Sequence, residues 1–363
     1  MSAPSIPNLL SLRSGRGGRG GRGGRGGSAP RRDGPAGGGP SHDANIQNTD
    51  TDAAVSRLSA VDMGYLEDPY APYFVSRADG PPAKRYPIIN RGTYTRTTAL
   101  DKLIDAFISP SISDGSKPSQ RQIISLGAGT DTRPFRIFSQ ASTSHLIYHE
   151  IDFDIIATRK LQTIQGNPIL SRILTETSPG DGQTWTAKPA HGGEYYCHGV
   201  DLRELDNSTQ GLLTGIRTDI PTLVLSECCL CYLKHEEATR VVSYFASRIA
   251  NLGLIVYEPV HLDDPFGKTM VSNLAARGIQ MPGLDRYRSS EDQIARLRDA
   301  GFATAKCLTV DDIWEKWVGE EEKERIHGLE RLDEVEEWKL LAGHYIVVWG
   351  YKGTGLGIMT NVE

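Results

Sequence analysis

Apolar runs of strand length alternate with stretches of helical periodicity from Gln120 onward. The runs at 222–226 and 254–257 are almost continuously apolar, as in strands that helices cover on both faces. This alternation is typical of an α/β fold built on a doubly wound, mostly parallel sheet. We expect seven strands, at 122–126, 146–151, 194–200, 222–228, 252–258, 303–308 and 344–350.

Helical segments fill the gaps between these strands. One follows the second strand at 155–165, and another spans 235–250 after the fourth strand. Capping side chains at 289–292 indicate the start of a helix that continues to residue 300. The last predicted helix, at 333–341, precedes the final strand, which an antiparallel insertion near the sheet edge would accommodate.

The first 50 residues differ in composition from the rest of the chain. Residues 15–27 repeat Gly-Arg-Gly, and the segment up to His42 holds too few apolar side chains to offset the entropy of ordering. We therefore expect three regions. They are a disordered Gly/Arg-rich tail at 1–50, a helical lid or N-terminal extension at 51–118 and the α/β domain at 119–363.

Charge separates the tail from the remaining chain. The tail holds seven Arg and three Asp with no Lys or Glu, which gives it a net charge of +4. The whole chain has a net charge of −5, so the remainder carries −9. An acidic body argues against nucleic acid as the main substrate of the folded part. The Arg-Gly-Gly tail could still contact RNA through its charge, although a solvated tether is the simpler interpretation.

Targeting signals and cysteine chemistry narrow the setting further. No apolar run reaches the roughly 18 residues that a membrane span needs, and the N-terminus lacks the apolar region of a signal peptide. We therefore expect no membrane association and a location in the cytosol or nucleus. The five cysteines include Cys228, Cys229 and Cys231 in one apolar segment. Their number and spacing predict reduced, buried thiols and no bound metal.

The most informative local pattern is a predicted strand that runs into the turn Gly127-Ala-Gly-Thr-Asp-Thr132. Its glycines allow a sharp turn and let a ligand approach the backbone N–H groups, although such turns also serve only to reverse the chain. Threonine replaces the third glycine of the dinucleotide fingerprint. The next strand ends at Asp152, 25 positions after Gly127, where a carboxylate can accept hydrogen bonds from ribose hydroxyls. The pair predicts a nicotinamide dinucleotide or S-adenosylmethionine, and the missing glycine together with Asp131 favours the latter.

Further motifs are ordered along roughly residues 55–352. They occupy 62–70, 89–96, 126–131, 150–153, 158–160, 200–203, 226–228, 264–267 and 329–334. Together they resemble the leucine carboxyl methyltransferase family, whose members methyl-esterify the C-terminal leucine of the protein phosphatase 2A catalytic subunit. The resemblance implies a class I S-adenosylmethionine-dependent methyltransferase with an N-terminal helical lid.

The resemblance also implies how the cofactor is held. Arg96 would contact the methionine carboxylate, because a planar guanidinium can form two parallel hydrogen bonds with it. Asp152 would bind the ribose hydroxyls, and Glu227 would lie beside the methionine ammonium. Asp201 and Leu202 would flank the adenine, whereas Arg57 departs from the family pattern, in which some members have lysine. The implied cofactor-binding residues are Arg57, Arg96, Gly127, Asp152, Asp201, Leu202 and Glu227.

The implied acceptor is a peptide C-terminal carboxylate, and the implied partner is the tail of the phosphatase catalytic subunit. A C-terminal carboxyl group has an unperturbed pKa of roughly 3.3–3.7 and is ionised at neutral pH, so no general base is expected. The carboxylate must still be aligned with the methyl group, and we expect Arg203 or Tyr232 to be the catalytic residue that orients it. A small-molecule O-methyltransferase and an RNA-associated methyltransferase with an RNA-binding tail are the alternatives, and a dehydrogenase would require nicotinamide binding.

Overall fold

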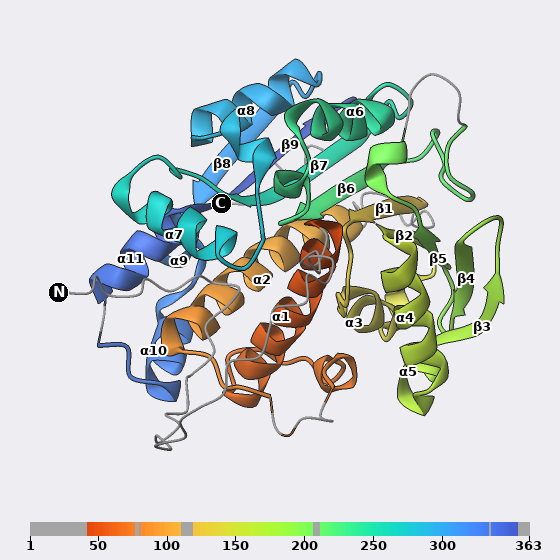
Figure 1. Cartoon of the computed structure of the whole chain (residues 1–363). Coiled ribbons are helices and arrows are strands. Elements are labelled where there is room, and N and C mark those ends of the chain that lie inside the picture. The colour runs from red at the N-terminus through yellow and green to blue at the C-terminus, as the bar shows by residue number, and fades with distance from the viewer. Residues whose placement is uncertain are drawn as a thin grey trace, which may run out of the picture.

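The computed structural model describes residues 42–76, 80, 82–109, 119–205, 211–333 and 335–354. Within these ranges the centre of the molecule is a nine-stranded sheet in the order β3-β4-β5-β2-β1-β6-β7-β9-β8 (Figure 1). The five strands from β5 to β7 in this order are parallel, whereas β9 is antiparallel to both β7 and β8. The strands are β1 (Arg121–Leu126), β2 (Leu146–Asp152), β3 (Leu174–Pro179), β4 (Thr184–Pro189), β5 (Glu194–Gly199), β6 (Thr222–Glu227), β7 (Leu252–Pro259), β8 (Thr304–Thr309) and β9 (Tyr345–Lys352).

All seven predicted strands are confirmed, with ends that shift by one or two residues, and β9 is the antiparallel insertion that we expected. The predicted number of seven was wrong, because β3 and β4 form an antiparallel hairpin that extends the sheet beyond β5. Both strands of the hairpin are short and end in proline, and β3 is largely accessible to solvent. A polar, half-exposed edge strand lacks the apolar run that marks the central strands.

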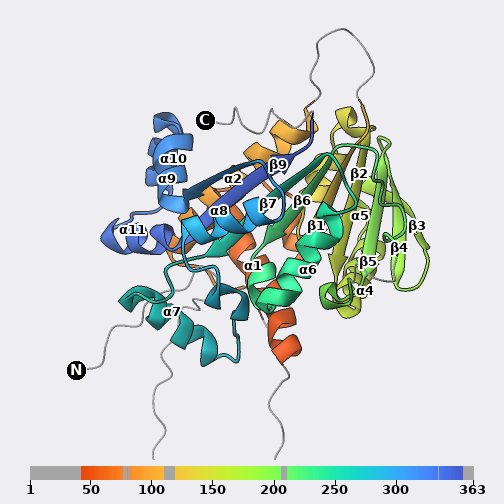
Figure 2. The same ribbon diagram turned by 90° about the horizontal axis from the view of Figure 1, so that it is seen from above.

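Helices cover both faces of the sheet (Figures 1 and 2). On one face, α2, α3 and α11 contribute Phe107, Phe135 and Trp338 to the larger apolar core. On the other face, α6 and α8 contribute Val241 and Leu297 to a second core. The fold is therefore a three-layer α/β/α arrangement, and burial of these two cores supplies its main stabilisation.

The four predicted helices are confirmed as α4, α6, α8 and α11, although α6 ends at Ala246 rather than at 250. The predicted cap of α8 is present, because the Ser289 side chain accepts a hydrogen bond from the backbone of Asp292. The helices are α1 (His42–Asp62), α2 (Pro87–Ile108), α3 (Arg133–Phe138), α4 (Asp154–Gln165), α5 (Pro168–Ile173), α6 (His235–Ala246), α7 (Pro265–Ala275), α8 (Ser290–Asp299), α9 (Val310–Trp317), α10 (Glu320–Leu329) and α11 (Val335–Gly343).

The region before the sheet differs from our expectation in two ways. Helix α2 is buried along most of its length and packs against α1, α9, α11 and β9, so it belongs to the main core as well as to the cavity described below. Helix α1 begins at His42, so residues 42–50 are helical and the predicted tail boundary at residue 50 was wrong. Residues 1–41 of the predicted tail lie outside the described residues. Among the helices described, none has the length and apolar character that crossing a membrane takes.

Candidate active site

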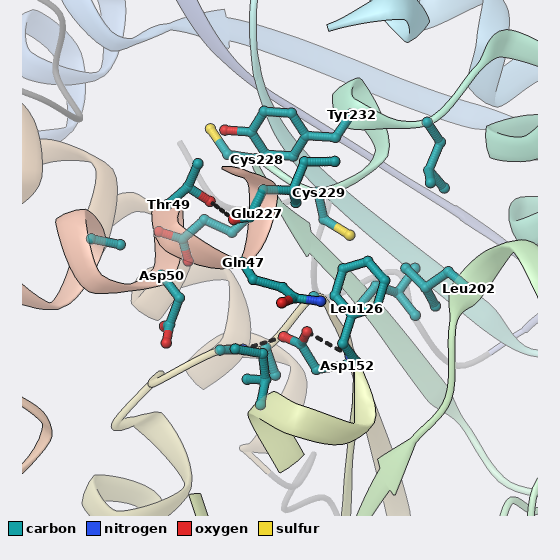
Figure 3. Close-up of a pocket in the computed structure, with 18 of the residues that line it drawn as sticks. Gln47, Thr49, Asp50, Leu126, Asp152, Leu202, Glu227, Cys228, Cys229 and Tyr232 are labelled. Carbon is teal, nitrogen blue, oxygen red and sulfur yellow. Dashed lines mark hydrogen bonds between the residues drawn. The ribbon is translucent and has the colours of Figure 1, made fainter. Parts of the chain in front are cut away.

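A cavity of about 400 Å³ lies at the carboxyl ends of β1, β2 and β6 (Figure 3). The chain order reverses between β1 and β6, and open α/β sheets bind ligands at such a switch point. The first half of α1 forms one wall, and the loops after β5 and β6 form others. All nine predicted site residues line this cavity. They are Arg57, Arg96, Gly127, Asp152, Asp201, Leu202, Arg203, Glu227 and Tyr232.

The glycine-rich turn after β1 is held by hydrogen bonds within the protein. Gly127 and Gly129 have φ angles of +58° and +52°, which favour glycine. The N–H of Gly127 donates to the carbonyl of Ile151 at 2.8 Å, and that of Gly129 donates to Asp152. A β-carbon at Gly127 would lie 2.6 Å from Sγ of Cys229. These glycines therefore serve the tight turn and the close approach of neighbouring segments, and both N–H groups already have acceptors within the protein.

Asp152 ends β2 and points into the cavity (Figure 3). Its two carboxylate oxygens accept hydrogen bonds from the backbone N–H groups of Gly129 and Phe153, each at 2.7 Å. Burial nevertheless raises the pKa of Asp152 to about 7, with a further contribution from nearby Asp50. A ligand that donates hydrogen bonds here, such as a ribose diol, would favour the ionised carboxylate.

The segment after β5 carries the predicted adenine contacts. Asp201 caps the short helix Leu202–Glu204 by accepting from the backbone N–H of Arg203 at 2.9 Å. The Arg203 guanidinium binds Asp201 and also reaches Asp43 of α1 at 2.8 Å. Burial alone would raise the pKa of Asp201, but the hydrogen bonds from Arg203 hold it below its usual value. The structure thus favours Arg203 as a tie between this loop and α1 rather than as a ligand for the acceptor carboxylate.

Glu227 ends β6, and two guanidinium groups contact its carboxylate. Nε of Arg96, from α2, lies 2.9 Å from Oε1, and Nη1 of Arg133, from α3, donates to Oε2 at 2.8 Å. We expected the ammonium of the cofactor to neutralise this carboxylate, because an unpaired buried charge is costly. The two arginines already supply the compensating charge. Glu227 can therefore accept a hydrogen bond from a ligand without depending on the ligand for neutralisation.

Arg133 is a central residue that the sequence did not reveal. Its side chain is 2% exposed, and its guanidinium contacts Asp101 at 2.8 Å, Asp131 at 2.7 Å and Glu227 at 2.8 Å. Burial alone would raise the pKa of Asp131, but Arg133 is the main cation that holds it far below its usual value. The same carboxylates raise the pKa of Arg133 despite its burial. The arginine therefore fixes the glycine-rich turn and Glu227 relative to each other.

Arg57 and Tyr232 complete the predicted set. Nε of Arg57 donates to Asp68 at 2.5 Å, and the same carboxylate accepts from Thr132 at the end of the glycine-rich turn. Tyr232 is buried next to Cys228 and Cys229 (Figure 3), and burial raises the pKa of its hydroxyl well above the usual value. Tyr232 therefore stays a neutral hydrogen-bond donor at physiological pH.

The five cysteines of the chain are all free thiols, two buried and three partly exposed.

The backbone amides of the turn bear on the two cofactors that the sequence suggested. The N–H groups of Gly127 and Gly129 donate to acceptors within the protein, and that of Thr130 donates to Asp50. A pyrophosphate at this turn would find these amides engaged and would lie beside the carboxylates of Asp50 and Asp152, whereas S-adenosylmethionine carries no phosphate. The residues present therefore fit S-adenosylmethionine better than a dinucleotide. Among the described residues, no group of three or more His, Cys, Asp or Glu could hold a metal ion.

A cavity at the switch point of a mostly parallel sheet is typical of an α/β enzyme that binds a nucleoside cofactor. The model of the leucine carboxyl methyltransferase family matches residues 45–246, so the chain belongs to that family. It is a carboxyl methyltransferase that uses S-adenosylmethionine. The matched segment runs from α1 to the end of α6 and contains all nine predicted site residues.

Curated relatives match over most of the chain. Leucine carboxyl methyltransferase 1 of Emericella nidulans is 47% identical and covers 85% of this chain and 86% of its own. The protein of the same name from Aspergillus fumigatus is 46% identical over 89% of this chain and 86% of its own. The rat protein of that name is 31% identical and covers 86% and 91%, respectively.

Proposed function

We propose that this chain transfers a methyl group from S-adenosylmethionine to the α-carboxylate of the C-terminal leucine of the protein phosphatase 2A catalytic subunit. The product is a methyl ester. The observation that carries the proposal is the match to the leucine carboxyl methyltransferase family across 45–246, the segment that contributes most of the cavity lining. The carboxylates at the ends of β2 and β6 suit the ribose and the ammonium group of the cofactor of such a reaction.

The residues of the chain would position the reactants rather than exchange protons with them. The bound cofactor supplies an electrophilic methyl group on a sulfonium. The acceptor carboxylate is ionised at neutral pH, so alignment is the main requirement. Asp152 would hold the ribose, while the ion pairs of Glu227 with Arg96 and Arg133 fix the end of the cavity that would receive the methionine moiety. The wall formed by α1 would limit the access of water while opposite charges on nucleophile and sulfonium are neutralised.

Tyr232 is the better of the two candidates for orienting the acceptor. Tyr232 lines the cavity and its hydroxyl stays protonated, so it can donate to a carboxylate oxygen. Arg203 is shared between Asp201 and Asp43 and would have to leave one of them to bind an acceptor. We therefore assign the orienting role to Tyr232 and the support of the adenine-side loop to Arg203.

The proposal is tested by incubating the enzyme with a labelled methyl donor and the phosphatase catalytic subunit. The matched control is the same subunit without its terminal leucine. We expect label only on the subunit that ends in leucine. Equal labelling of both proteins would refute carboxyl-terminal methylation, and labelling confined to small molecules or RNA in a cell extract would favour the alternative activities.

A further inference from the structure

The first half of α1 is tied to several parts of the cavity rim at once. Asp43 binds Arg203 on the adenine side, and the side-chain amide of Asn45 donates to the carbonyl of Gly278 at 3.1 Å. Asp52 forms an ion pair with Arg277, beside the end of α7. A helix that only packed against the core would not need polar contacts to the segments that follow both β5 and β7. The segment 42–52 is therefore built into the cofactor cavity.

The contact of Asp50 with the glycine-rich turn is the most specific of these. Oδ1 of Asp50 accepts from both the backbone N–H and the hydroxyl of Thr130, each at 2.7 Å. The preceding N–H, of Gly129, donates to Asp152 at 2.7 Å. Two consecutive amides of the turn are thus held by carboxylates from α1 and β2, which Figure 3 shows on different elements around the cavity.

The local geometry leaves little room for another arrangement. A β-carbon at Gly129 would lie 2.5 Å from Oδ1 of Asp50, so the turn and α1 approach each other as closely as glycine allows. The proximity of Asp50 also raises the pKa of Asp152, which means that the two carboxylates repel each other. Such a like-charge pair persists because each member accepts hydrogen bonds from the turn between them.

We propose that Asp50 is a positioning residue for the cofactor. It fixes the turn from the side opposite Asp152, and so it holds the Asp152 carboxylate where a ribose can reach it. Its substitution should weaken cofactor affinity and leave the chemical step at saturating cofactor nearly unchanged. The proposal concerns the cofactor half of the site, so it stands or falls independently of which acceptor the enzyme methylates.

The test measures S-adenosylhomocysteine binding by calorimetry, together with KM for the methyl donor and kcat. Asp50→Ala removes both hydrogen bonds and should raise Kd and KM about tenfold. Asp50→Asn keeps a carbonyl acceptor for Thr130 and should recover most of the affinity. The matched control is Asp62→Ala, which removes an exposed carboxylate at the far end of the same helix and should leave Kd unchanged.

Thermal unfolding of each variant separates a local effect from misfolding. If Asp50→Ala does not fold, Thr130→Val removes the hydroxyl donor without altering α1 and should raise Kd in the same direction by a smaller factor. Wild-type affinity in Asp50→Ala, or an equal loss in the Asn variant, would overturn the positioning role. A fall in kcat at unchanged Kd would overturn it as well.

Discussion

Replacing Arg133 with methionine would remove a guanidinium that contacts three carboxylates beside the cofactor cavity. Methionine is a flexible apolar residue that can occupy much of the space along the arginine stem. Asp131 would lose its nearest cation, Asp101 would keep Arg136, and Glu227 would keep Arg96. The substitution therefore leaves one carboxylate without its main partner and two with half of their compensating charge.

The size of the effect follows from burial. The Arg133 side chain is 2% exposed, so solvent cannot take over its role. Removing one partner of such a buried ion pair costs about 3–5 kcal/mol, and each kcal/mol lowers Tm by about 2–4 °C in large domains. At about 2 °C per kcal/mol, the Arg133→Met variant should unfold about 6–10 °C below the wild type.

The assay is thermal unfolding followed by circular dichroism at several pH values. The folded-state pKa of Asp131 lies below its unfolded value, so its stabilisation is present above about pH 4 and is lost as pH falls through the folded pKa. Without Arg133 this contribution disappears, so the difference in Tm should be largest near pH 7 and shrink below about pH 4. Lys188→Met, which breaks an exposed pair with Glu176, is the control and should leave Tm unchanged. A difference under about 2 °C, or one that does not depend on pH, would show that the ion pairs of Arg133 do not stabilise the fold.

Three further outcomes follow from the site. Asp152 has a pKa of about 7, and a ribose would donate to its ionised form, so affinity for S-adenosylhomocysteine should fall as pH drops below about 7. The Asp152→Asn variant should show no such dependence. A flat wild-type profile in calorimetry would contradict the ribose assignment. Deleting residues 1–41 should leave cofactor binding intact. Deleting residues 1–50 should weaken cofactor binding strongly, because the longer deletion removes cavity-lining residues of α1. Equal affinities of the two deletion variants would show that this helix segment is dispensable. Tyr232→Phe should lower kcat without changing the Kd for the cofactor, since it removes only the hydroxyl that we expect to orient the acceptor carboxylate. An unchanged kcat would exclude that role.

The sequence predicted the central strands because their environment is simple. A strand covered on both faces must be continuously apolar, and 222–226 and 254–257 carry that pattern in their residues alone. The hairpin of β3 and β4 has no comparable signal, because its polar residues face solvent and its position depends on pairing with β5. Its existence is decided by tertiary contacts that no local pattern records.

The same distinction holds for the site. Asp152 could be predicted because it ends a strand next to the glycine-rich turn, and the carboxyl ends of parallel strands meet at one edge of the sheet. Glu227 came from the family resemblance, and the structure places it at the end of β6 at the same edge. Arg133 could not be predicted, because its three partners come from different elements. Asp50 was assigned to a tail, since the Gly-rich composition before it obscured the start of α1. A tail boundary that is predicted from low hydrophobicity lies too far along the chain when polar contacts, rather than an apolar face, hold the first turns of the helix.

The most direct test of the proposed activity is to locate the transferred methyl group on the phosphatase catalytic subunit by tandem mass spectrometry. We expect one added methyl on the terminal leucine, as an ester that mild base removes. The cofactor-site variant Asp152→Asn should lose this product at limiting cofactor. A base-stable methyl group on a side chain elsewhere in the subunit would show that the enzyme is not a C-terminal carboxyl methyltransferase.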